Sequence, residues 1–327
     1  MCFKKIKKQK VIFYTTAMIF TSCAYLLIRY NATRSLGVQS PLHENKVALA
    51  LTMLNVITDN IRLLLWPSNL STSDAFLISR SIMENYTFVS FMIISALIAI
   101  AIYYLKKDKL ISFCLFWFFI TLLPVLNIIP ILYLRADHFL YIPSLGFCIL
   151  TAAILHKNRA FLRHSLIIIL IFSILTISRN KDWQNEISLF SKSIKSHPQA
   201  KEAHACLGFA YHQKGLHEKA SHHYKKALIS NPSYYSFSRP GRILENLANI
   251  YYAGHLYKWA EKYYQMALEF EPEDGNIHLG LGNVYYEQNQ YQKAIDSYQA
   301  SLRYSPSNSS AHHNLSKAYE KQVGLKK

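Results

Sequence analysis

The chain has 327 residues, 36 Lys and Arg against 19 Asp and Glu, a formal net charge of +17 and 51% hydrophobic residues. This apolar content excludes an intrinsically disordered chain, which cannot bury a core. Residues 1–182 carry 19 of the basic residues, 7 of the acidic ones and the long apolar runs. The remainder has the composition of a soluble domain, so the sequence excludes one uniform globular domain and predicts two regions.

Charge-free apolar runs predict a membrane domain over residues 1–180. The predicted spans are about 11–28, 86–105, 110–130, 139–155 and 162–178. Segment 47–66 is also apolar, but Asp59 and Arg62 interrupt it, and a charge at mid-bilayer costs about 2.5–3.5 kcal/mol. We therefore expect an interfacial or re-entrant segment there. A cleaved signal peptide is the alternative for the first run, but the run continues past Cys23.

The distribution of basic residues predicts the topology, because Lys and Arg concentrate in short cytoplasmic loops. Five spans place the N-terminal Lys cluster, residues 106–109 and the 156–164 loop on the cytoplasmic side. Everything after Arg179 then faces a bacterial periplasm or an endoplasmic reticulum lumen. The basic excess lies beside apolar spans rather than along a polar face, which favours a lipid bilayer as partner and no nucleic acid.

The polar region, residues 181–327, carries an internal repeat. Leu247, Leu281 and Leu315 recur every 34 residues, with small and aromatic residues at matching positions after each. This is the tetratricopeptide period, and it predicts helix pairs over 201–234, 241–274 and 275–308 with a partial repeat over 309–327. Small residues such as Gly208 and Gly282 let the paired helices approach closely. The expected fold class is all-α, a multi-span helical membrane domain followed by a tetratricopeptide-repeat superhelix.

An insertion separates the first two repeats, because Leu207 and Leu247 are 40 residues apart rather than 34. The extra residues form the aromatic loop 234–241, which ends in Pro-Gly. An exposed contact surface is one interpretation of this loop. We favour the other, in which its rings pack on adjacent helices.

The repeats also predict a peptide-binding groove. Helix pairs of this kind turn the first helix of each pair towards a concave groove, where Asn and Tyr recur at equivalent places in successive repeats. An amide donates and accepts hydrogen bonds together, so a row of Asn can hold the backbone of an extended peptide. The predicted groove residues are Asn246, Asn249, Tyr252, Asn283, Tyr286 and Asn314.

Sequence signatures of other chemistry are missing. The five cysteines are scattered without a CxxC pair, so we expect no disulfide framework and no metal site. The sequence has no Gly-rich phosphate loop, no GxSxG and no HExxH. We therefore expect no cofactor.

Several segments carry a resemblance to a known family: residues 25–30, 62–71, 117–124, 127–130 and 136–147, with 179–183 at the junction to the repeats. They resemble the transmembrane and tetratricopeptide-repeat protein O-mannosyltransferases and their bacterial relatives. The resemblance covers essentially the whole chain in order, and the 136–147 stretch is the most specific. It implies a type C integral-membrane glycosyltransferase that takes its sugar from a polyprenyl phosphate carrier at the exoplasmic face.

The chain departs from this family at the place of catalysis. Such transferases need an exoplasmic carboxylate to activate the acceptor hydroxyl, and the family carries it several spans before the segments matched here. We therefore expect that the catalytic N-terminal half is lacking and that sugar transfer requires it. Asp74 and Asp137 are weak candidates for a replacement acid, and His138 stands where the family usually has Arg.

The loop 131–143 holds the candidates for binding a sugar donor. Arg135 and His138 are suited to pair with a lipid phosphate, and Tyr141 to donate a hydroxyl or stack on a sugar. An interfacial anchor, where Arg, His and Tyr commonly sit, is an equally supported alternative. Two hypotheses of function follow: the membrane and repeat portion of an O-mannosyltransferase-like enzyme, or a non-catalytic membrane-anchored scaffold whose repeats bind peptides or proteins.

Overall fold

The computed structural model describes residues 45–67, 75–127, 134–135, 137–157, 159–229, 231, 233–235 and 238–324. The predicted span 11–28 and the candidate acid Asp74 lie outside these residues. The chain divides into two compact units, which are considered separately. Unit 1 comprises Met1–Leu64 and Ile78–Ala153, and unit 2 comprises Leu65–Leu77 and Ile154–Lys327.

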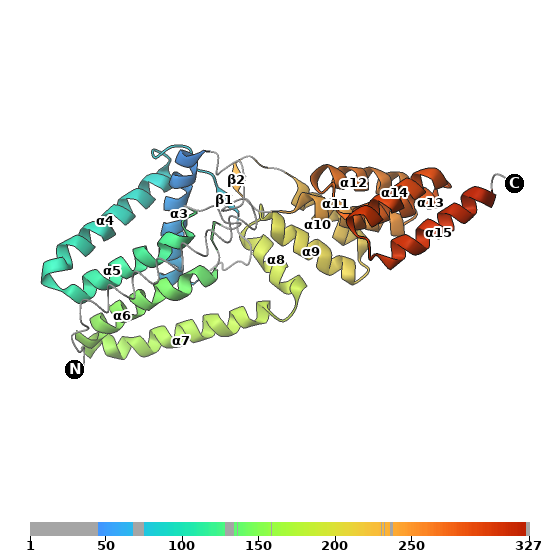
Figure 1. Cartoon of the computed structure of the whole chain (residues 1–327). Helices are drawn as coiled ribbons and strands as arrows, with labels where there is room; N and C mark the ends of the chain where they lie inside the picture. Colours follow the sequence, from blue (N-terminus) through green and yellow to red (C-terminus); the bar gives the residue numbers. More distant parts are fainter. Residues whose placement is uncertain are drawn as a thin grey trace, which may run out of the picture. The chain divides into compact units, whose positions relative to one another are not determined.

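Unit 1 is helical (Figure 1). Its elements are α3 (Lys46–Leu65), α4 (Asn85–Lys107), α5 (Lys109–Leu122), the 3-10 turns η1 (Leu123–Val125) and η2 (Asp137–Leu140), and most of α6 (Tyr141–Lys157). Asp108 makes the sharp turn between α4 and α5, because its extended backbone ends α4 and its carboxylate accepts from the amide of Leu110 at 3.1 Å. The acid within the 106–109 basic cluster is thus an N-cap.

Two of the described helices, α3 and α4, are long and apolar enough to cross a membrane, while Lys109–Val125 and Tyr141–Leu155 form shorter apolar helices. The predicted run 110–130 is not one α-helix. It ends at Leu122 because Pro124 follows in η1, and Asn127 then adopts a positive φ of 56°. Segment 47–66 forms the continuous helix α3, and its placement in or along a bilayer stays a prediction.

Helix α3 buries a polar face inside unit 1. The Asn55 amide donates to the hydroxyls of Ser79 at 2.7 Å and Thr87 at 3.1 Å, and the Ser79 backbone amide donates to Thr52 Oγ1 at 3.0 Å. All four side chains are buried. Two polar residues of α3, Thr52 and Asn55, are therefore hydrogen-bonded to the chain that follows the helix.

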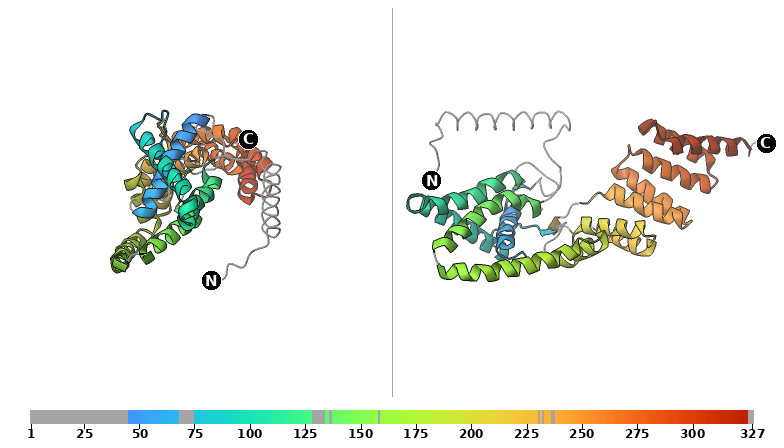
Figure 2. Two further views of the ribbon diagram at one scale, coloured as in Figure 1. Left: turned by 90° about the vertical axis from the view of Figure 1, so that its left-hand side faces the viewer. Right: turned by 90° about the horizontal axis from the view of Figure 1, so that it is seen from below.

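Unit 2 stacks helix pairs in chain order (Figure 2). Two helices, α7 (Arg159–Asp182) and α8 (Glu186–Ser196), lead into the repeats. Successive pairs follow, and α15 packs on α14. The repeat helices are α9 (Lys201–Gln213), α10 (His217–Leu228), α11 (Pro240–Ala253), α12 (Tyr257–Phe270), α13 (Gly275–Glu287), α14 (Tyr291–Tyr304) and α15 (Ser309–Gly324).

A buried tyrosine on the second helix of each pair fills the space beside a small residue on the first. Tyr224, Tyr264 and Tyr298 are at most 2% exposed. A Cβ added at Gly208 would lie 2.7 Å from the Tyr224 ring, and one added at Gly282 would lie 2.6 Å from the Tyr298 ring. The small residues of the repeat pattern are therefore needed for close contact between paired helices.

The insertion between the first two repeats forms a strand. Within unit 2, β2 (Tyr234–Tyr235) pairs antiparallel with β1 (Phe76–Leu77), in the register Phe76 with Tyr235 and Leu77 with Tyr234. This strand pairing was not predicted, and the packing of the loop's rings on adjacent helices stays a prediction. The backbone of the loop has a partner more than 150 positions earlier in the chain, in the segment between α3 and α4.

Candidate functional site

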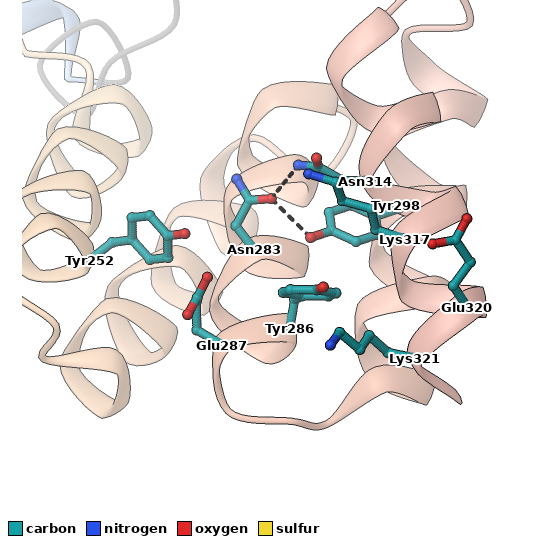
Figure 3. A pocket seen from close by; sticks show the side chains of 9 residues that line it. All are labelled: Tyr252, Asn283, Tyr286, Glu287, Tyr298, Asn314, Lys317, Glu320 and Lys321. Atoms are coloured by element: carbon teal, nitrogen blue, oxygen red, sulfur yellow. Dashed lines mark hydrogen bonds between the residues drawn. The ribbon is translucent and has the colours of Figure 1, made fainter. Parts of the chain in front are cut away.

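The repeats enclose a polar pocket on the side of the first helices. Its volume is about 410 Å³, within the range typical of ligand sites. Its walls come from α11, α13, α14 and α15 (Figure 3). The lining residues are Tyr252, Asn283, Tyr286, Glu287, Tyr298, Asn314, Lys317, Glu320 and Lys321.

Asn283 is held in one orientation by two internal hydrogen bonds. Its Oδ1 accepts from the Tyr298 hydroxyl at 2.9 Å and from Nδ2 of Asn314 at 2.8 Å, as Figure 3 shows. Both acceptor positions of this oxygen are thereby used. No described residue accepts a hydrogen bond from the Asn283 Nδ2 group, so its two N–H donors are available to a ligand.

Asn249 has the same arrangement one repeat earlier. The buried Tyr264 hydroxyl donates to its Oδ1, as Tyr298 does to Asn283. Each pair is separated by 15 residues, so the pairing recurs with the repeat. Of the six predicted groove residues, the structure brings Tyr252, Asn283, Tyr286 and Asn314 into one pocket; Asn249 and Asn246 do not line it.

Charged residues of the pocket were not predicted from the sequence. Glu287 follows Tyr286 on α13. Burial raises the pKa of the Tyr252 and Tyr257 hydroxyls, and the Glu287 carboxylate raises it further. Lys317, Glu320 and Lys321 come from α15. They follow Asn314 by three, six and seven residues, so each lies three or four residues from another member of the set. This spacing places them on one helix face, which is the signal that could have found them.

The candidate residues for binding a sugar donor lie in unit 1, whereas the pocket belongs to the repeats. The Arg135 side chain is fully buried and forms an ion pair with Asp59, whose other oxygen accepts from Nε of Arg62 at 2.8 Å. Asp59 was not predicted as a site residue, because in the sequence it only interrupts an apolar run. Tyr141, at the start of α6, is 79% exposed, and Asp137 begins η2. The side chain of His138 lies outside the described residues.

A titratable pair links the first two repeat helices. Nδ1 of His204 and Nδ1 of His223 are 3.0 Å apart. One ring therefore donates its N–H to the other, which must be neutral because its accepting nitrogen carries no proton. Burial lowers the pKa of both, that of His223 to about 4. Among the described residues, no three His, Cys, Asp or Glu side chains are grouped as metal ligands.

Comparison with protein families confirms the repeats. Residues 202–234 match the model described as "Tetratricopeptide repeat" and residues 282–323 the model described as "TPR repeat". Among solved structures, the chain is similar to MamA, with 21% identity, a TM-score of 0.39 and coverage of 45% of this chain and 82% of that one. The first TPR of Spaghetti (RPAP3), bound to an HSP90 peptide, has 18% identity, a TM-score of 0.35 and coverage of 38% and 94%.

Comparison with curated proteins confirms the resemblance to protein O-mannosyltransferases. The chain is 32% identical over 120 residues to protein O-mannosyl-transferase F38B6.6 of Caenorhabditis elegans, covering 35% of this chain and 17% of that protein. It is 29% identical over 177 residues to human protein O-mannosyl-transferase TMTC3, covering 51% and 18%. The aligned segments span 12% to 21% of the length of the curated relatives. The chain thus resembles one part of these proteins.

Proposed function

We propose that this chain is the membrane and repeat portion of an O-mannosyltransferase-like glycosyltransferase, and that its repeats hold an extended peptide. The observation that carries the proposal is the pocket lined by Asn283, whose Oδ1 is held by Tyr298 and Asn314 while its Nδ2 group has no partner among the described residues. The similarity to protein O-mannosyl-transferases supports the link to glycosyl transfer.

The groove chemistry suits a peptide backbone. The Asn283 oxygen is occupied by Tyr298 and Asn314, so its Nδ2 group donates to a carbonyl oxygen of the bound chain. Tyr252 and Tyr286 add ring surface beside this donor (Figure 3). Recognition of backbone carbonyls is independent of side-chain identity, which suits a site that receives many acceptor sequences.

Unit 1 would supply contacts to a polyprenyl phosphate sugar. Two guanidinium groups contact the Asp59 carboxylate there. Arg62 is the more accessible of the two, with 41% of its side chain exposed, and is suited to a phosphate oxygen. Arg135 would position Asp59, and the exposed Tyr141 would contact the sugar.

We assign the repeats to the exoplasmic side of the membrane. The distribution of Lys and Arg favours this orientation. The pairing of β1 with β2 supports a shared face for the repeats and the segment between α3 and α4, because paired strands cannot lie on opposite sides of a bilayer. The chain would then be a multi-pass protein whose groove faces a periplasm or lumen.

A second candidate function is a non-catalytic membrane-anchored scaffold. The pocket favours it, because all of its lining residues belong to the repeats. Peptide binding through the groove is common to both candidates. Binding of a polyprenyl phosphate sugar to the full chain separates them, since only the first candidate requires contacts to that donor.

Losing the Asn283 side chain should weaken peptide binding by about five- to a hundredfold. A hydrogen bond left unmade in a buried groove costs roughly 1–3 kcal/mol, which corresponds to this range. The measurement probes a peptide array with the full chain in detergent, then repeats the titration of any bound peptide with Asn283→Ala and Asn249→Ala. Asn276→Ala is the matched control, because Asn276 lies on the same helix but outside the pocket. Equal affinity of all the variants would place the contact elsewhere.

The topology is tested by cysteine labelling in intact cells. In a background without native cysteines, Ser73→Cys and Ser307→Cys should both react with an impermeant maleimide, because both positions are assigned to the outer face. Lys107→Cys is the control, and it should react only after the membrane is permeabilised. Labelling of only one of the first two positions would contradict the assignment.

A further inference from the structure

One side of the pocket is acidic and aromatic. The Glu287 carboxylate lies between the rings of Tyr252 and Tyr286 in the view of Figure 3. Glu287 is exposed, and no Lys or Arg among the described residues lies within 4 Å of it. The Tyr257 hydroxyl is hydrogen-bonded to this carboxylate. Without a cationic partner among the described residues, the carboxylate is still suited to a cationic group of a ligand.

The basic residues of the pocket lie on its other side. Lys317 and Lys321 come from α15, whereas Glu287 comes from α13. Among the described residues, no ion pair joins Glu287 to Lys317 or Lys321, and Glu320 places a second carboxylate on the α15 side of the pocket.

We propose that Glu287, Tyr252 and Tyr286 form a subsite for an arginine side chain of the bound peptide. This inference rests on the proposed peptide-binding function and adds a side-chain preference to it. A cation is attracted to the faces of tyrosine rings and to the carboxylate between them.

Arginine suits this subsite better than lysine. Its planar guanidinium stacks on aromatic rings and donates two parallel hydrogen bonds to one carboxylate, while an ammonium acts as a point charge. Two rings flanking a carboxylate match the planar group. We therefore expect the order Arg, then Lys, then neutral side chains.

A preference for arginine would identify a local acidic group, because the overall charge of the chain opposes the binding of basic peptides. With a formal net charge of +17, the chain attracts acidic peptides and repels basic ones at long range. A preference for arginine must therefore come from a local group. Glu287, which has no cationic partner among the described residues, is the carboxylate beside the tyrosines of the pocket.

The test is a double-mutant cycle on the full chain in detergent. A positional-scanning peptide library first identifies a bound peptide, whose arginine is then replaced by citrulline, a neutral group of the same shape. The arginine peptide should bind the unmodified chain about tenfold more tightly than the citrulline peptide. Glu287→Gln should bring this ratio close to one. Glu320→Gln, which removes another glutamate of the same pocket, should leave the ratio unchanged.

Each outcome separates this inference from the proposed function. Peptides that bind without a preference for arginine, or whose preference survives Glu287→Gln, would overturn the subsite and leave peptide binding intact. A library with no bound member would overturn both. Hydrogen exchange of α13 in Glu287→Gln shows whether the helix is still folded, and Glu287→Asp, which keeps the charge, should retain part of the arginine preference.

Discussion

Replacing Tyr264 by alanine should lower the free energy of unfolding of the repeats by about 3–5 kcal/mol. Tyr264 is 2% exposed and lies in the hydrophobic core shared by α11, α12 and α13. Removing its ring leaves a cavity and also frees Oδ1 of Asn249 from the tyrosine hydroxyl. Hydrogen exchange of the full chain in detergent measures the effect on the repeats alone.

Two further substitutions separate the ring from its hydroxyl. Tyr264→Phe keeps the ring and loses the hydrogen bond to Asn249, so it should cost about 1 kcal/mol. Phe270→Ala on the same helix removes a side chain that is 55% exposed and should change stability by less than about 1 kcal/mol. A Tyr264→Ala variant as stable as Phe270→Ala would show that the tyrosine is not part of the core.

Replacing Asp59 by asparagine should destabilise unit 1 by about 3–5 kcal/mol, because it breaks the ion pair between Asp59 and the fully buried Arg135 guanidinium. Thermal unfolding in detergent measures the change. Arg62→Gln is the matched control, because Arg62 contacts the same carboxylate from an accessible position and should cost less than about 1 kcal/mol.

The double variant identifies the cause. Asp59→Asn combined with Arg135→Gln removes both charges and should recover most of the lost stability, because no unpaired charge remains buried. Equal losses in Asp59→Asn and Arg62→Gln would show that the buried ion pair does not hold unit 1 together.

The repeats could be predicted from the sequence because their packing is local and periodic. The 34-residue spacing places Gly282 against Tyr298, and the same geometry recurs in each repeat. The bond from Tyr298 to Asn283 follows from this spacing too, since it joins the two helices of one pair. Four of the six predicted groove residues meet in one pocket for that reason.

Contacts between distant segments could not be predicted in this way. Asp59 and Arg135 are separated by 76 positions, and no repeat or motif relates them. The pairing of Tyr235 with Phe76 likewise joins an insertion to a segment in a different part of the chain. Such contacts depend on the tertiary arrangement, which a single sequence does not encode as a local pattern.

The central claim, that the groove holds the backbone of a peptide, is tested most directly by amide-to-ester substitution in a bound peptide. An ester carbonyl is a weaker hydrogen-bond acceptor, so the ester that faces Asn283 should lower affinity for the full chain by about two- to tenfold. The same ester should cause no further loss in Asn283→Ala, because the donor is already absent. Affinity that is insensitive to every ester position and to Asn283→Ala would contradict backbone recognition by this groove.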